Sequence, residues 1–178
     1  EGWSDGWWAS CTPVKTSHIN GLNNGKKLTF VTSIGCGVAM FTTTGDANCF
    51  GEAWIELGTP TQPRGGVAFV GPTSNTHTTY NNYLDKGIYI GMFREGLDSP
   101  GEALLRGKLH MYSVFGNTIA VEHHFKIYCV LGDPSIHIWK DTPNPVIVTR
   151  PDSIYIGLNQ VQISVKDSVS GLPIFNAR

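Results

Sequence analysis

The chain has no excess of charge of either sign and no long apolar run. Among its 178 residues, 13 Lys and Arg nearly balance 14 Asp and Glu, which gives a formal net charge of −1. A nearly neutral protein has no basic field to attract nucleic acid, so we expect no nucleic-acid partner. No apolar stretch approaches the roughly 18 to 20 residues that a membrane-spanning helix needs. We therefore expect no transmembrane segment.

Cysteine is also scarce. The four cysteines are Cys11, Cys36, Cys49 and Cys129, and none belongs to a Cys-x-x-Cys pair. Four are too few for a disulfide scaffold in a chain of this length, and the spacing gives no zinc signature. Cys49 is expected to pack in the core. Cys11 and Cys129 can pair if the protein is exported, although the sequence does not show whether they are close.

The composition is that of a globular protein with many turns. Hydrophobic residues make up 40% of the chain and charged residues 15%, with 21 Gly and 10 Pro. The low Lys and Glu content and the high Thr, Asn and Gly content fit an exported bacterial protein. The sequence does not begin with Met, so we expect Glu1 to be an internal point of a longer polypeptide.

Residues 27–52 combine a predicted strand with an accessible thiol. Residues 28–34 form an apolar, β-branched run, which is typical of a strand buried on both faces of a helix-covered sheet. Gly35 and Gly37 flank Cys36, let the chain turn sharply and leave room for a substrate. Since such sheets bind ligands at the carboxyl ends of their strands, the pattern predicts a nucleophilic Cys36. The alternative is a small buried hydrophobic residue.

The hydrophobic periodicity around this stretch predicts an α/β domain. The expected elements are a short helix over 16–22, a helix capped by Asp46 or Asn48 that runs to about Leu57, a buried strand over 66–70, helices over 78–94, 99–112 and 117–130, and a short strand over 136–139. Strand, helix and strand in this order form a βαβ unit. Residues 1–11 show no clear period and read as a loop.

Three histidines are candidate site residues. The loop over 71–79 should rise beside Cys36 at the same sheet edge, and it carries His77. His77 is either a partner of the thiol or an ordinary surface histidine. His123 and His124 suggest a metal site, but adjacent side chains on a helix point about 100° apart and do not easily share one ion. We expect no metal there.

The last part of the chain predicts a second domain. Residues 141–145 (Asp-Thr-Pro-Asn-Pro) read as a linker between a first domain over 1–140 and a β-rich segment over 146–178. Strands are predicted over 146–149, 154–156 and 161–165, with a hairpin connection over 167–173. An immunoglobulin-like sandwich needs about 100 residues and seven strands, so this segment is expected to be its first part.

Four motifs, in this order, resemble those of the gingipain-type cysteine peptidases. They are Ile34-Gly35-Cys36 with Phe41, Cys49-Phe50-Gly51-Glu52, residues 66–71 with Ser74-Asn75, and Val130-Leu131-Gly132-Asp133-Pro134-Ser135. The resemblance covers most of residues 1–140, and the tail resembles the sandwich that follows the catalytic domain in that family. It implies part of a caspase-like α/β sheet with helices on both faces, followed by part of an antiparallel β-sandwich.

The resemblance also implies site residues. Cys36 matches the nucleophile of a cysteine endopeptidase, and its backbone N–H would be one oxyanion donor. The partner histidine ends the preceding strand in the family and is expected upstream of Glu1, so the isolated chain is expected to be inactive. Leu84 stands where arginine-specific members place a tryptophan against the substrate. Trp3 is expected either to wall the cleft or to lie in the core, and His77 completes the expected substrate contacts.

The resemblance implies a protein or peptide substrate, no required cofactor and a secreted or surface location on a bacterium. It allows calcium, and other segments of the same processed precursor are further expected partners. Two alternatives use the same fold. A sortase-like transpeptidase would resolve the acyl-enzyme with an amine, whereas an inactive surface scaffold would need no reactive thiol.

Overall fold

The computed structural model describes residues 2–8, 12–42, 48–141 and 145–175. The chain forms two compact units, Glu1–Ile138 and Trp139–Arg178. The division lies close to the domain end predicted at residue 140. Most of the predicted linker falls outside the described residues.

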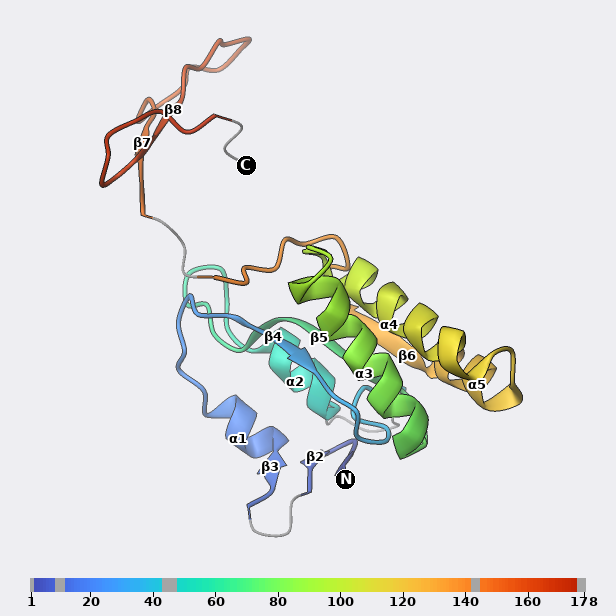
Figure 1. Cartoon of the computed structure of the whole chain (residues 1–178). Helices are drawn as coiled ribbons and strands as arrows, with labels where there is room; N and C mark the ends of the chain where they lie inside the picture. The colour runs from blue at the N-terminus through green and yellow to red at the C-terminus, as the bar shows by residue number, and fades with distance from the viewer. Residues whose placement is uncertain (1, 9–11, 43–47, 142–144, 176–178) are drawn as a thin grey trace. The chain divides into compact units, whose positions relative to one another are not determined.

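A three-stranded sheet lies at the centre of the first unit (Figure 1). Its strand order is β4 (Thr29–Thr32), β5 (Gly66–Pro72) and β6 (Tyr128–Gly132). β4 and β5 are parallel and are connected through α2 (Phe50–Glu56), as the predicted βαβ unit requires. β6 runs antiparallel to β5. The carboxyl ends of β4 and β5 therefore meet at one edge of the sheet.

Helices cover both faces of this sheet. α3 (Thr78–Phe93), α4 (Pro100–Phe115) and α5 (Ile119–Ile127) lie on one face, and their apolar side chains share a core with Val70 of β5. α2 and the short α1 (Thr16–Asn20) pack on the other face with Phe69. Neighbouring residues of a strand point to opposite faces, so β5 contributes to both cores. The predicted α/β architecture with helices on both faces is confirmed.

α3 and α4 pack closely where glycines meet. A Cβ atom added to Gly87 of α3 would lie 2.8 Å from the Gly107 Cα atom of α4. A Cβ atom on Gly107 would lie 2.6 Å from the Leu84 carbonyl oxygen. The missing side chains let the two helix backbones approach each other.

The first residues form short strands rather than the predicted loop. β1 (Gly2–Trp3), β2 (Gly6–Trp7) and β3 (Val14–Lys15) pair antiparallel in that order. Strands of two residues are too short to produce an alternating pattern, so they could not be predicted from periodicity.

One predicted helix boundary and one predicted strand near the end of the first unit are wrong. The helix expected over 117–130 ends at Ile127, and the chain continues as strand β6. A short apolar run such as Tyr128-Cys129-Val130-Leu131 suits a helix or a buried strand equally, and pairing with β5 decides the outcome. The strand expected over 136–139 is irregular backbone, in which the Ile138 N–H donates to the Asp98 carbonyl oxygen at 2.6 Å.

The second unit contains an antiparallel hairpin of β7 (Val146–Thr149) and β8 (Ser164–Asp167). The strand expected over 154–156 is irregular, and the one expected over 161–165 begins at Ser164. Ile156 and Leu158 are fully exposed. No helix among the described residues has the length and apolar character needed to cross a bilayer.

Candidate active site

Cys36 lies in the loop that follows β4, at the carboxyl edge of the parallel strand pair. Backbone hydrogen bonds fasten this loop to the segment after β5. The Gly37 N–H donates to the Ser74 carbonyl at 3.0 Å, and the Ala39 N–H donates to the Pro72 carbonyl at 3.0 Å. The cysteine is therefore held beside the second loop by main-chain contacts.

The glycines on either side of Cys36 have separate roles. Gly37 has a φ of +60°, a conformation that residues with a Cβ atom rarely adopt. Gly35 faces the backbone of β1, since an added Cβ atom would lie 3.2 Å from the Gly2 Cα atom. Together they bring the Cys36 loop against the first strand, which carries Trp3.

A pocket of about 710 Å³ opens beside Cys36. Indole rings, hydroxyls and amides line it, and none of the described lining residues carries a charged side chain. They are Gly2, Trp3, Trp7, Trp8, Thr32, Ser33, Ile34, Gly35, Cys36, Asn75, Thr76, Thr78 and Asn81. Such a mixture of apolar surface and a few polar groups is typical of a ligand site.

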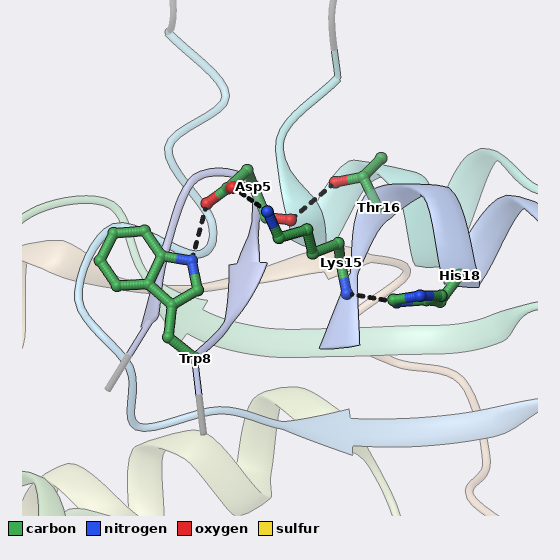
Figure 2. A network of polar contacts seen from close by, with 5 residues as sticks. All are labelled: Asp5, Trp8, Lys15, Thr16 and His18. Atoms are coloured by element: carbon green, nitrogen blue, oxygen red, sulfur yellow. Dashed lines mark hydrogen bonds and ion pairs between the residues drawn. The ribbon is translucent and has the colours of Figure 1, made fainter. Parts of the chain in front are cut away.

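Two of the tryptophans in the pocket wall are held by hydrogen bonds. The Trp7 Nε1–H donates to the Ser33 hydroxyl at 2.7 Å. The Trp8 Nε1–H donates to the Asp5 carboxylate at 3.1 Å, and the same carboxylate lies 3.9 Å from the Lys15 ammonium (Figure 2). These contacts fix the orientation of the two indole rings in the pocket wall.

Thr76 lies directly beside the Cys36 sulfur. Its backbone N–H donates to Sγ at 3.3 Å, and its hydroxyl oxygen also lies 3.3 Å from Sγ. The Asn81 amide nitrogen donates to that hydroxyl at 2.7 Å, and the Tyr128 hydroxyl donates to the Asn81 amide oxygen at 2.9 Å. A continuous chain of hydrogen bonds thus joins β6, α3 and the loop after β5 to the thiol.

The other described cysteines have environments that suppress thiolate formation. Cys49 is buried as expected, and burial raises its pKa to about 11. Burial also raises the pKa of Cys129, whose Sγ lies 3.7 Å from the Gly71 carbonyl oxygen. Cys129 is a free thiol in the structure, and Cys11 lies outside the described residues.

The structure brings together only part of the expected site. Trp3 lines the pocket with Cys36. His77 is the N-cap of α3, where its Nδ1 atom accepts the Thr79 N–H, and it is not among the pocket residues. Leu84 belongs to the buried side of α3 and is fully covered by the core, so its side chain presents no surface to a substrate. These placements differ from the contacts expected for His77 and Leu84.

The histidine pair of α5 supports the loop after β5 instead of forming a shared ligand set. The His124 Nδ1–H donates to the Ala120 carbonyl at 2.7 Å, and its Nε2 atom accepts the His77 backbone N–H at 3.2 Å. Both ring nitrogens of His124 are therefore occupied. The His123 ring lies 2.9 Å from the Asn75 carbonyl oxygen. Within the described ranges, no three His, Cys, Asp or Glu side chains are grouped so that they could hold a metal ion.

Sequence reasoning did not identify Thr76, Asn81 or Tyr128 as site residues. Asn81 could have been identified, because it lies on the same buried face of α3 as Leu84 and Ile88. A buried amide on that face needs hydrogen-bond partners. No pattern marks Thr76, whose role depends on how two separate loops meet.

Comparisons with known proteins agree with this arrangement. The family model for peptidase family C25 matches residues 2–139. No curated protein sequence gives a significant match. A crystal structure of the Arg-specific cysteine proteinase gingipain R (RgpB) is similar, with a TM-score of 0.71 and 20% identity over 91% of this chain and 37% of that one.

Two further solved structures are similar. The complex of Porphyromonas gingivalis RgpB pro- and mature domains gives a TM-score of 0.70 at 20% identity, over 91% of this chain and 38% of that one. A structure described as that of a protease gives 0.69 at 20% identity, over 97% and 42%. The chain thus spans about two fifths of the solved chains it matches.

At this level of identity, the structural likeness establishes the caspase-like α/β fold. The family model covers most of the chain, including the pocket and Cys36. This chain therefore belongs to peptidase family C25, a family of cysteine peptidases.

Proposed function

We propose that the protein containing this chain is a cysteine endopeptidase with Cys36 as its nucleophile. The observation that carries the proposal is the position of Cys36, at the sheet edge, in a pocket, with two donor atoms of Thr76 3.3 Å from its sulfur. Cys49 and Cys129 lack this setting, because burial raises the pKa of each. A nucleophilic thiol needs both access and stabilisation of its thiolate.

In the proposed reaction, the Cys36 thiolate attacks the scissile carbonyl carbon and forms an S–C bond. The carbonyl oxygen becomes an oxyanion, and collapse of this intermediate breaks the C–N bond and releases the amine. Water then hydrolyses the thioester, which breaks the S–C bond, releases the carboxylic acid product and restores the thiol. No cofactor is needed for these steps.

The Cys36 backbone N–H is the proposed oxyanion donor. Among the described residues it makes no hydrogen bond to a protein acceptor, so it is available to a substrate oxygen. A donor already in place when charge develops is the arrangement that stabilises such an intermediate.

The amine leaving group needs a proton, for which we propose a histidine supplied by a segment that precedes residue 1. His77 does not line the pocket, and both His124 ring nitrogens are occupied, so we do not assign this role to either. The site is thus proposed to be completed by another part of the same precursor. The solved complex of RgpB pro- and mature domains supports the proposal of associated segments. We also propose that the protein is exported from a bacterial cell, a proposal supported by its composition.

The described part of the pocket offers a substrate side chain mainly apolar contacts. Three indoles line it, and no described lining residue is an Asp or Glu that would pair with arginine or lysine. We therefore do not extend the arginine specificity of gingipain R to this chain.

Labelling of the full-length protein with a peptidyl acyloxymethyl ketone tests the nucleophile. We expect one adduct on Cys36, detected by peptide mass spectrometry, and none in the Cys36→Ala variant. Cys129→Ala is the matched control and should label like the unchanged protein. Persistent labelling of Cys36→Ala would exclude Cys36, and absence of any adduct would favour the inactive scaffold. Product analysis with added amines then separates hydrolysis from transfer.

A further inference from the structure

We infer that Thr76 is a positioning residue whose two donors stabilise the negative charge that the Cys36 sulfur carries when it reacts as a nucleophile, with its hydroxyl oriented by Asn81 and Tyr128. The inference rests on the proposed function of Cys36 and deepens it.

The orientation of the Asn81 amide follows from its partners. Its nitrogen lies 2.9 Å from the Ile34 carbonyl oxygen, which can only accept, so the NH2 group must face that way. The same nitrogen gives its second hydrogen to the Thr76 hydroxyl at 2.7 Å. The amide oxygen then accepts from the Tyr128 hydroxyl at 2.9 Å. Burial raises the pKa of Tyr128, which keeps this donor protonated.

The direction of these hydrogen bonds fixes the orientation of the Thr76 hydroxyl. Because its oxygen already accepts from Asn81, its single hydrogen is free to point at the Cys36 sulfur 3.3 Å away. The Thr76 backbone N–H approaches the same sulfur at 3.3 Å. Both donors of one residue therefore converge on Sγ, whereas the Thr76 carbonyl oxygen, an acceptor for the thiol proton, lies farther away at 3.7 Å. Hydrogen bonds to an ionised acceptor are stronger than those to a neutral one, so this pair favours the thiolate.

The supporting residues are shielded from water. Asn81 is 3% exposed and Tyr128 is 2% exposed. A fully satisfied buried network holds one geometry, whereas an exposed hydroxyl would be free to rotate toward solvent. The backbone next to Thr76 is also held in place, because the His77 N–H donates to the His124 ring.

Other titratable groups lie near this chain of hydrogen bonds. Asp85 follows Asn81 by one turn on α3, and burial raises its pKa, while a hydrogen bond from Thr32 of β4 opposes the shift. His77 and His124 flank Thr76 from the loop and from α5. All of them stay unchanged in the variants below. A change in the pH profile is therefore assigned to the hydrogen bonds that join Tyr128, Asn81 and Thr76 to Cys36.

Thr76→Val removes the hydroxyl and keeps the volume and the backbone N–H. We expect the pH at which iodoacetamide alkylates Cys36 at half its maximal rate to rise by about one unit. Thr76→Ser should restore the original midpoint. Tyr128→Phe removes only the hydroxyl that donates to Asn81, so it should shift the midpoint in the same direction by a smaller amount. Rates are measured on the 178-residue chain by mass spectrometry of the Cys36 peptide.

An unchanged midpoint in Thr76→Val, or failure of Thr76→Ser to restore it, would overturn the inference. A merely structural role would lower the melting temperature and leave the midpoint in place. If Thr76→Val does not fold, Tyr128→Phe decides, because an unchanged midpoint there removes the proposed orienting chain. Alkylation requires no peptidase activity. A shifted midpoint without labelling by the peptidyl ketone would therefore refute the proposed function and retain the role of Thr76.

Discussion

At the scale of single residues, two buried polar side chains support the loop after β5. Asn81 holds the Thr76 hydroxyl, and His124 accepts the His77 backbone N–H. His124 is 2% exposed, so its ring must remain neutral to keep its place in the core. The polar groups that organise the site are thus also groups whose loss would weaken the fold.

His124 predicts a pH dependence of stability. Burial lowers its pKa below the value of about 6.5 for an unfolded chain, so between these two values the unfolded state binds more protons. The stabilisation is complete above about pH 6.5 and is lost as the pH falls below it. We expect the free energy of unfolding, measured with urea, to fall from pH 7.5 to pH 5.

Substitution separates His124 from other groups. His124→Gln should reduce the pH dependence, whatever it does to stability at neutral pH. The pKa of His110 is also lowered by burial, so His110→Gln serves as the comparison. This variant should retain the pH dependence of stability that His124 causes. An equal slope in His124→Gln and the unchanged chain would contradict the assignment.

Sequence patterns predicted the placement of the thiol better than its surroundings. Flanking glycines at the end of an apolar run led to Cys36, because chain reversal at a strand end leaves a local signature. Thr76 had no such signature, since its contact with Cys36 depends on two loops separated by α2 and β5. Leu84 was assigned by resemblance alone, and its helical phase places it in the core.

At the scale of elements, the close packing of α3 and α4 depends on residues without side chains. Gly87 and Gly107 meet where the helices touch. These long helices were predictable because they are periodic and capped, as the Ser99 cap with Glu102 shows for α4. β6 was missed because its strand character comes from pairing with β5.

Gly107→Ala should destabilise the protein although alanine favours helices. The new Cβ atom would lie 2.6 Å from the Leu84 carbonyl and 2.7 Å from the Ile88 Cγ1 atom, so the helices must separate. Overpacking costs about 1–3 kcal/mol, against a gain of about 1 kcal/mol in helix propensity. We expect a lower melting temperature, measured by circular dichroism. Leu105→Ala on the exposed side of α4 should have little effect, and a stabilised Gly107→Ala would show that the contact is loose.

At the scale of the whole molecule, both hydrophobic cores belong to the first unit. Every described residue of the two clusters precedes Trp139. In the second unit, large apolar side chains such as Tyr155, Ile156 and Leu158 are almost fully exposed. The first unit therefore contains the packing that stabilises a domain, and no described residue of the second unit belongs to either core.

Removal of residues 139–178 should leave the first unit folded. We expect the shortened chain to keep its melting temperature within about 2 °C, since a change of 1 kcal/mol shifts it by about that much or more. The pH profile of Cys36 alkylation should also be unchanged. A large fall in either measurement would show that the tail supports the site.

The backbone bonds from Gly37 to Ser74 and from Ala39 to Pro72 have a consequence for motion. They fasten the segment that carries the sulfur to the segment that carries its hydrogen-bond donors. An opening that separates the two segments breaks both bonds, so these two amides should then exchange with deuterium at similar rates. Fluctuations of the sheet edge would then move the sulfur and its donors as one body, and their mutual geometry would not have to be rebuilt at each encounter with a substrate.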